Sequence, residues 1–215
     1  MNRSGLRVHG NRLIELRKQA GLTQLDLAVR SGYSERVIRK AESGGLLRFE
    51  TVQDIAQCLS SPQRIVTTAD LLRTHLDLAM QFVHAYDHHG RGALEHCDGL
   101  FADDFEFYCP GDSEQVAFVG LWSGTEGMQS FFDRFYGIFT RDPGSLKPVY
   151  LESKERIVAR YEDRVYFDGH SMPPFWVNLH FQFRDGCIAR IDDEYDTRLA
   201  SEAFGELLAR LGRLG

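Results

Sequence analysis

Turn residues divide the chain before residue 60 into four short segments, each with the apolar spacing of a helix. Gly21 and Gly32 stand where the first two segments end, and glycine suits the left-handed C-terminal cap of a helix. Thr23 and Ser34 precede the following segments and are favourable N-cap residues. Two helices joined by a turn containing glycine form a helix-turn-helix arrangement, so this part of the chain is constrained to a small all-α domain. The expected helices end near Ala20, span 24–31 and 35–42, and place Val52, Ile55, Ala56 and Leu59 on one face.

The residues at the turns and on the apolar faces form one continuous motif. It reads Gly21-Leu-Thr23-Gln24-x-x-Leu27-Ala28-x-x-x-Gly32-x-Ser34-x-x-x-Ile38-x-x-x-Glu42-x-Gly44. In this register the segment resembles the DNA-binding domain of the Cro/phage-repressor (XRE) family. The family usually has proline in the loop after the last glycine, where this chain has Leu46-Leu47-Arg48, and a larger apolar residue at Ala41. Neither departure conflicts with the fold.

The resemblance implies that the third helix reads the major groove of double-stranded DNA. On this helix, Arg36 and Lys40 suit acceptors on guanine, and Glu35 suits the amino group of cytosine. Gln24 resembles the family residue that anchors a phosphate or touches a base edge. The alternative is that these are solvated charges on an exposed helix. The expected DNA-contact residues are Gln24, Ser34, Glu35, Arg36, Arg39, Lys40, Ser43 and Arg48.

Arg17 and Glu42 are charged but are expected to be structural. In the family the matching arginine and glutamate pair with each other across the domain. A partly buried pair of this kind adds little net stability, but removal of one partner leaves an uncompensated charge.

Charge is distributed unevenly along the chain. The net charge of the whole chain is -6. Residues 1–69 hold 11 Lys+Arg and 6 Asp+Glu, a net charge of +5, so the remainder carries -11. A basic first part joined to an acidic second part indicates two functions, of which only the first suits nucleic acid.

Composition excludes several classes of protein. A hydrophobic content of 43% with only 6 prolines excludes collagen-like and wholly disordered chains. No apolar stretch is long enough to span a membrane, and residues 1–10 lack the apolar core of a secretory signal, so we expect a cytoplasmic protein. The four cysteines, whose spacing fits no zinc or redox motif, are expected to be reduced: Cys58, Cys97, Cys109 and Cys187.

The second part of the chain begins with helical periodicity and continues with strand alternation. Ser60-Ser61-Pro62 breaks the periodicity and is interpreted as the start of a linker, which predicts domains over 1–66 and 67–215. The expected helices are 70–89, 93–101, one starting at Ser123 and 199–214, and the expected strands are 105–109, 148–154, 156–167, 174–184 and 187–196. Asp185-Gly186 predicts a hairpin between the last two strands.

Short motifs recur at set intervals through this second part: Gly90-Arg-Gly-Ala-Leu94, Phe101-Ala-Asp-Asp104, Tyr108-Cys-Pro-Gly111, Gly124-Thr-Glu-Gly127 and Phe181-x-Phe183-x-Asp185-Gly186-x-Ile188. They resemble the SnoaL-like/ketosteroid-isomerase-like domains of the nuclear-transport-factor superfamily. The resemblance implies an α+β cone with a curved, mostly antiparallel sheet. The expected fold class of the whole chain is therefore α+β, a small all-α domain followed by this cone.

The resemblance indicates the fold better than an activity. Cys109 and Leu179 occupy the two positions at which ketosteroid isomerases carry carboxyl groups, so that activity is not expected. Alternation predicts an apolar ligand pocket with one acid, lined by Tyr86, Phe105, Phe107, Cys109, Leu179, Phe181, Phe183, Ile191, Asp193 and Tyr195. Asp193 is the one candidate general base, if burial raises its pKa. The alternative is a structural Asp193, either solvated or hydrogen-bonded to Tyr86 or Tyr195.

The histidines and the outer strand face are two further groups of candidate residues. His84, His88 and His89 contain one i, i+4 pair but no metalloprotease pattern, so we expect no metal and no cofactor, only histidines placed favourably at a helix C-terminus. Trp176, Asn178, His180 and Gln182 occupy the strand face opposite the pocket. Such a mixed face suits a homodimer contact, the usual use of that face in this superfamily, although a solvated face is the alternative.

These observations predict a sequence-specific DNA-binding transcriptional regulator whose C-terminal cone dimerises it and senses a small apolar ligand. The alternative is a SnoaL-like enzyme acting on an apolar or polyketide-like molecule, with Asp193 as base. A third hypothesis is that the cone is a dimerisation scaffold that binds no ligand.

Overall fold

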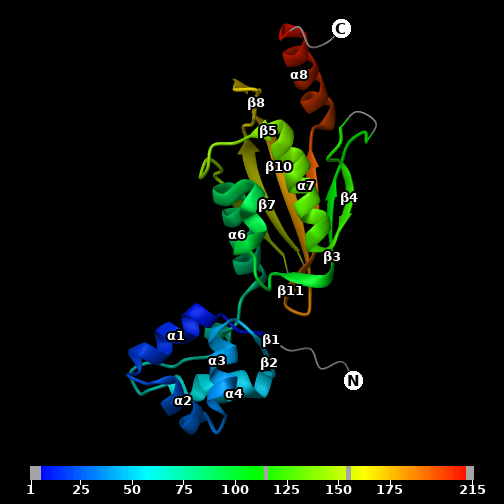
Figure 1. Cartoon of the computed structure of the whole chain (residues 1–215). Coiled ribbons are helices and arrows are strands. Elements are labelled where there is room, and N and C mark those ends of the chain that lie inside the picture. The colour runs from blue at the N-terminus through cyan, green and yellow to red at the C-terminus, as the bar shows by residue number, and fades with distance from the viewer. Residues whose placement is uncertain (1–5, 114–115, 154–155, 212–215) are drawn as a thin grey trace. The chain divides into compact units, whose positions relative to one another are not determined.

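A computed structural model describes residues 6–113, 116–153 and 156–211 (Figure 1). The chain divides into two compact units, an N-terminal unit up to Thr74 and a C-terminal unit from His75. The first is helical and the second combines helices with a mixed sheet, so the fold class is α+β as predicted.

The N-terminal unit is built of five helices and one short two-stranded sheet within the described residues. Its elements are β1 (Leu6–Arg7), α1 (Gly10–Gln19), α2 (Gln24–Ser31), α3 (Glu35–Glu42), β2 (Leu46–Leu47), α4 (Phe49–Leu59) and α5 (Thr68–Leu71). The apolar faces of the helices meet in one core, in which Leu13, Leu27 and Ile38 are fully buried. The antiparallel pair β1–β2 was not predicted, because two residues are too few to show an alternation.

Local capping sets the ends of α2 as the sequence predicted. The backbone N–H of Asp26 donates to Oγ1 of Thr23 at 3.1 Å, and the N–H of Thr23 donates to Oδ2 of Asp26 at 2.8 Å. This reciprocal capping box satisfies two amides at the start of the helix. Gly32 ends the helix with a φ of 72°, a left-handed conformation that glycine adopts without strain.

The division between the units falls after Thr74, later than the predicted boundary at 66/67. Residues 60–66 are not a linker: Oγ of Ser60 accepts from the N–H of Val66 at 2.9 Å and turns the segment back onto α4. Val66 and Leu71 are buried in the N-terminal core. The segment therefore belongs to the first unit.

The single helix predicted over 70–89 is wrong, because it is two helices. Leu72 is extended between α5 and α6 (His75–His89), with a φ of -101° and a ψ of 143°. Leu71 is buried in the N-terminal core, whereas Leu78 is buried in the core of the C-terminal unit. One continuous apolar stripe in the sequence thus serves two separate cores.

The C-terminal unit begins with α6. Its other elements are η1 (Gly90–His96), β3 (Phe101–Cys109), β4 (Gly120–Ser123), α7 (Gly124–Ile138), β5 (Phe139–Thr140), β6 (Val149–Glu152), β7 (Arg156–Asp163), β8 (Tyr166–Phe167), β9 (His170–Ser171), β10 (Phe175–Arg184), β11 (Cys187–Tyr195) and α8 (Thr197–Arg210). The segment predicted as a helix over 93–101 is the 3₁₀ helix η1 followed by the start of β3. Residue 154 of one predicted strand and residues 212–214 of the predicted terminal helix lie outside the described residues.

The main sheet has the order β4-β3-β11-β10-β7-β6 and is open and curved. Its pairs are antiparallel except β3–β11, which is parallel. The predicted hairpin joins β10 to β11, with positive φ values at Asp185 (51°) and Gly186 (73°) that match a type I′ turn. Helices α6 and α7 cover one face of the sheet (Figure 1), and their apolar sides fill the cone.

No helix among residues 6–113, 116–153 and 156–211 is long and apolar enough to cross a membrane.

Candidate nucleic-acid interface and cone interior

Helix α3 turns one face into the core and the other to solvent. Ile38 and Ala41 are fully buried on its inner side, whereas Arg36, Arg39 and Lys40 are exposed. Ile38 and Ala41 anchor the helix in the core, so its outer face presents positive charge to solvent.

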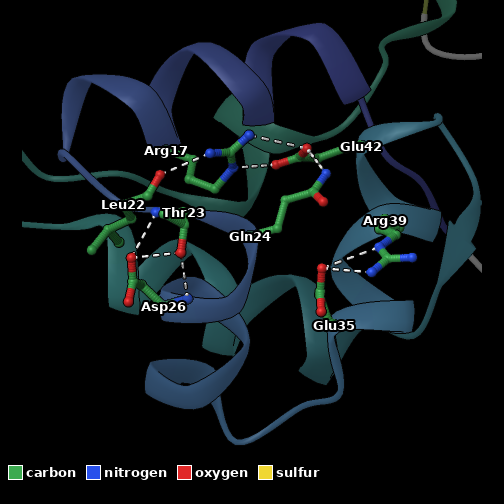
Figure 2. A network of polar contacts seen from close by, with 8 residues as sticks. All are labelled: Arg17, Leu22, Thr23, Gln24, Asp26, Glu35, Arg39 and Glu42. Atoms are coloured by element: carbon green, nitrogen blue, oxygen red, sulfur yellow. Dashed lines mark hydrogen bonds and ion pairs between the residues drawn. The ribbon is translucent and has the colours of Figure 1, made fainter.

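Glu42 is the centre of a buried polar network, as expected from its pairing with Arg17 (Figure 2). Nε of Arg17 donates to Oε1 of Glu42 at 2.5 Å, NH2 donates to Oε2 at 3.2 Å, and NH1 donates to the carbonyl of Leu22 at 2.7 Å. This network joins α1, α3 and the turn before α2.

Gln24 lies in the same network, which the sequence did not predict. Its Nε2 donates to Oε2 of Glu42 at 2.6 Å (Figure 2). The amide that the resemblance assigns to DNA is thus bonded within the protein.

Two of the expected DNA-contact residues bind each other on the surface of α3. NH2 of Arg39 donates to Oε1 of Glu35 at 2.6 Å, and Nε donates to the same oxygen at 3.2 Å (Figure 2). Exposed i, i+4 pairs are weak, so DNA can displace this one at small cost. Within the described part of the chain, Arg36 and Lys40 form no ion pair, so no salt bridge has to break before either binds an anion.

The remaining expected contact residues surround α3. Ser34 is its exposed N-cap residue and makes no capping hydrogen bond with its side chain. Oγ of Ser43 donates to the carbonyl of Lys40 at 2.9 Å, and Arg48 is exposed at the N-cap of α4. Hydroxyl and guanidinium groups at these positions suit phosphate oxygens.

The residues predicted to line a pocket lie inside the cone but are closely packed. Most are fully buried members of one core, with exposed fractions of 0% for Phe105, Phe181 and Ile191. Phe107, Cys109, Leu179 and Tyr86 are also buried, and Phe183, Asp193 and Tyr195 are half-buried. Two surface depressions of about 450 and 460 Å³ lie elsewhere, one beside η1 and α7 and one between α4 and residues 66–68.

Asp193 has an unusual environment for a carboxyl group. Its Oδ1 is shielded from solvent and has no hydrogen-bond partner among the residues that the structure describes. Burial, and then the negative charge of Asp163, raise the pKa of the Asp193 carboxyl to about 7, against the opposing effect of Arg141. Neither suggested phenol satisfies Oδ1, because the Tyr195 hydroxyl donates to the carbonyl of Pro110 at 3.0 Å and that of Tyr86 contacts Arg141.

The cone interior is more polar than the predicted apolar pocket with one acid. Arg141 pairs with Asp163, with Nε to Oδ1 at 2.8 Å and NH2 to Oδ2 at 2.6 Å. The same guanidinium contacts the hydroxyls of Tyr86 at 2.7 Å and Tyr136 at 3.2 Å, and it lies 4.3 Å from the centre of the Tyr86 ring. The side chains of both charged partners are nearly inaccessible, at 2% and 5% exposure.

The sequence carried a signal for one of these two residues. Asp163 follows Ile157, Ala159 and Tyr161 on the inward side of β7, so extending the alternation to that strand predicts it. Arg141 follows the two-residue strand β5, where no periodicity marks its direction.

The histidines do not converge on a metal position. The rings of His84 and His88 lie 4.0 Å apart, and those of His89 and His96 lie 3.5 Å apart. Among the described residues, no group of three or more histidine, cysteine or acidic side chains is arranged to hold a metal ion.

The outer face of the main sheet is mixed in character. Trp176 is 51% exposed, and the guanidinium of Arg160 lies 4.6 Å from its ring centre. Nε2 of His180 lies 2.6 Å from Oε2 of Glu194, and Gln182 donates to Asp192 at 3.2 Å. Exposed apolar side chains on β4 and β6 border this face: Leu121, Val149 and Leu151.

Residues 13–62 match the helix-turn-helix family. The rest of the chain is similar in structure to an NTF2-like protein of unknown function from Burkholderia pseudomallei, with 22% identity over 59% of this chain and 96% of that one, at a TM-score of 0.50. An NTF2-like protein from Burkholderia thailandensis has 16% sequence identity over 62% of this chain and 98% of its own, at a TM-score of 0.51. TerC, which was co-crystallised with polyporic acid, has 18% sequence identity over 60% of this chain and 98% of its own, at a TM-score of 0.50. No curated protein matches the chain.

These similarities agree with the two units. Residues 13–62 form a helix-turn-helix domain of the XRE type, and the C-terminal unit has the fold of the NTF2-like proteins. Both resemblances predicted from the sequence are confirmed at the level of the fold.

Proposed function

We propose that the protein is a sequence-specific DNA-binding transcriptional regulator that acts in the cytoplasm. The observation that carries the proposal is the helix-turn-helix match over residues 13–62, in which α3 exposes Arg36 and Lys40 without ion-pair partners among the described residues. An α-helix fits the major groove, and a guanidinium there forks onto the N7 and O6 atoms of guanine.

The C-terminal unit serves as the dimerisation domain in this proposal. Its exposed sheet face combines Trp176 with polar side chains, which is the composition of a protein–protein interface. A dimer presents two copies of α3 to half-sites about one helical turn apart, so the preferred DNA site is a palindrome with that spacing.

Selection from a randomised duplex library tests the proposal. We expect a palindromic site to be enriched, and Arg36→Ala and Lys40→Ala each to weaken its binding by about 1–3 kcal/mol. Lys18→Ala, which removes an exposed cation from the end of α1, is the matched control and should leave affinity unchanged. A library that yields no preferred site contradicts sequence-specific binding.

A small apolar ligand bound in the cone is the finer part of the proposal. The unpartnered Oδ1 of Asp193 supports it, because a buried acceptor is satisfied by a donor on a bound molecule. TerC, a structural neighbour, was crystallised with polyporic acid. Thermal-shift screening against apolar metabolites tests this part, since a ligand that binds the native state raises the melting temperature. A screen without any shift favours the scaffold hypothesis.

A SnoaL-like enzyme remains the second candidate. The observation in its favour is the Asp193 carboxyl, whose pKa is raised by burial to about 7, near the value that suits a general base at neutral pH. Turnover of an apolar or polyketide-like substrate that Asp193→Asn abolishes, without loss of binding, would favour catalysis over sensing.

A further inference from the structure

The solvent side of α3 carries two neighbouring rows of charged side chains. Residues four apart in a helix lie one above the other, so Arg36 and Lys40 form one row, and Glu35 and Arg39 form the other. The first row is wholly cationic and has no ion-pair partner among the described residues. The second row is an acid bonded to a base and has no net charge. The two rows therefore meet DNA with different electrostatics.

The bond between Glu35 and Arg39 occupies only part of each side chain. Nη2 and Nε of Arg39 both donate to Oε1 of Glu35, at 2.6 and 3.2 Å (Figure 2). A guanidinium has five N–H donors, so both N–H groups on Nη1 and one on Nη2 remain for another acceptor. Oε2 of Glu35 forms no hydrogen bond within the part of the chain that the structure describes. The intact pair thus offers an acceptor beside a fork of donors.

A C·G base pair presents the complementary pattern in the major groove. Cytosine offers its N4 amino group as a donor, and the guanine paired with it offers the acceptors O6 and N7. A carboxylate accepts from the cytosine amino group, and a guanidinium fork donates to the two guanine atoms. Reversing the base pair, or replacing it with A·T, removes at least one of these matches.

We propose that Glu35 and Arg39 act as one unit that reads a C·G base pair, with Glu35 on the cytosine and Arg39 on the guanine. The inference rests on the proposed DNA binding and deepens it, because it names one base pair in each half-site. Glu35 is the first residue of α3, and in helix-turn-helix domains the N-terminal residues of this helix contact the base edges. Arg39 follows one turn later on the same side.

Glu35 also keeps Arg39 from binding DNA without regard to sequence. An arginine without a partner binds phosphate well, and phosphate contacts are the same in every duplex. Glu35 pairs with this arginine and repels phosphate, so it favours the duplex whose bases satisfy both side chains. Loss of the acid should therefore strengthen binding to arbitrary DNA and weaken discrimination between sequences. A solvated pair without a role in recognition would not produce these two opposite changes.

Two measurements on the full chain test the inference. Selection from a randomised duplex library gives the base preference at each position, and salt titration with a mixed-sequence duplex gives the sequence-independent binding. For wild type we expect a C·G pair to be preferred roughly 5- to 150-fold at one position of each half-site. For Glu35→Gln we expect this preference to be lost. The slope of log K against log salt concentration should become steeper by about one unit, because Arg39 then neutralises a phosphate.

Two further variants separate the acid from the pair. Arg39→Gln should lose the preference at the same position as Glu35→Gln. Glu35→Gln/Arg39→Gln should lose it too, but with the wild-type salt slope, because its net charge is unchanged. The two side chains are 37% and 64% exposed, so their replacement leaves the core of the domain intact.

Glu15→Gln is the matched control. Glu15 accepts from Arg12 at 3.0 Å in an exposed ion pair on α1, so this variant makes the same change of charge and also releases an arginine. Neither residue is an expected DNA contact, and we expect the salt slope and the base preferences of wild type.

A Glu35→Gln variant that keeps the C·G preference, or whose salt slope does not become steeper, overturns the inference. Loss of preference at different positions in Glu35→Gln and Arg39→Gln overturns it as well, because the two side chains then do not read one base pair. A wild-type protein that selects no preferred site contradicts the proposed function itself.

Discussion

Asp193 is the residue whose chemistry departs furthest from its ordinary state. Its pKa is affected by the charges of the buried Arg141–Asp163 pair, in which the one guanidinium is already matched by one carboxylate. A second buried negative charge lacks compensation, so the neutral form is favoured. Titration of this carboxyl is therefore the measurement that bears on both roles proposed for it, a ligand contact and a general base.

The raised pKa of Asp193 predicts a pH-dependent stability. In the unfolded chain the carboxyl titrates near 4, and in the folded protein at about 7, so the native state holds a proton that the unfolded state releases between these values. The stability contributed by this group is present below about pH 4 and is lost as pH rises to about 7. We expect Asp193→Asn to be more stable than wild type by about 2–4 kcal/mol at pH 8 and nearly equal to it at pH 4.

Urea unfolding followed by tryptophan fluorescence measures this difference, because both tryptophans, Trp122 and Trp176, belong to the C-terminal unit. Asp103→Asn, which alters an exposed carboxyl on β3, is the control and should retain the wild-type pH dependence. Parallel stability curves for wild type and Asp193→Asn from pH 4 to 8 would show that the carboxyl does not titrate as inferred.

Elements with their own local end signals were predicted to the residue. Helix α2 has the expected bounds, because Thr23 and Gly32 act on the backbone next to them. Helix α3 also has the expected bounds, although the side chain of its N-cap residue Ser34 makes no capping hydrogen bond. The helix expected over 70–89 failed for the opposite reason. Its apolar stripe is continuous, and only the presence of two cores shows that it must break at Leu72.

Helices α1 and α3 approach so closely at Gly10 that we expect no larger side chain to be tolerated there. A β-carbon there would stand 2.1 Å from the carbonyl oxygen of Glu42, which belongs to backbone that cannot easily shift. We expect Gly10→Ala to destabilise the N-terminal unit by about 1–3 kcal/mol, measured by thermal unfolding with circular dichroism. Gly205→Ala, in the interior of α8 with nothing within 4 Å, should instead stabilise its helix by up to about 1 kcal/mol. Equal effects at the two glycines would contradict this packing.

The whole molecule combines a basic N-terminal unit with an acidic C-terminal one. In the proposed function, dimerisation through the C-terminal unit strengthens DNA binding by the N-terminal unit. If the outer sheet face is the dimer contact, Trp176→Glu places a charge in its apolar part. We expect this variant to sediment as a monomer and to lose affinity for a palindromic site by at least about tenfold, because the second half-site no longer adds to binding.

Met80→Glu is the matched control, since Met80 is similarly exposed, at 47%, on α6 of the same unit. A Trp176→Glu protein that remains dimeric would place the contact on another face.

The sequence by itself determined the architecture of two units, the helix-turn-helix and its outward cations, because capping, periodicity and motif spacing act over a few neighbouring residues. It also indicated the cone and its hairpin. Only the tertiary structure decided which polar groups meet: Arg141 with Asp163, Gln24 with Glu42, and Arg7 and Arg73 beside the end of α3. The hydrogen bonds among these groups join residues between 18 and 37 positions apart in the sequence. Such pairings depend on how the elements pack, which no local pattern encodes.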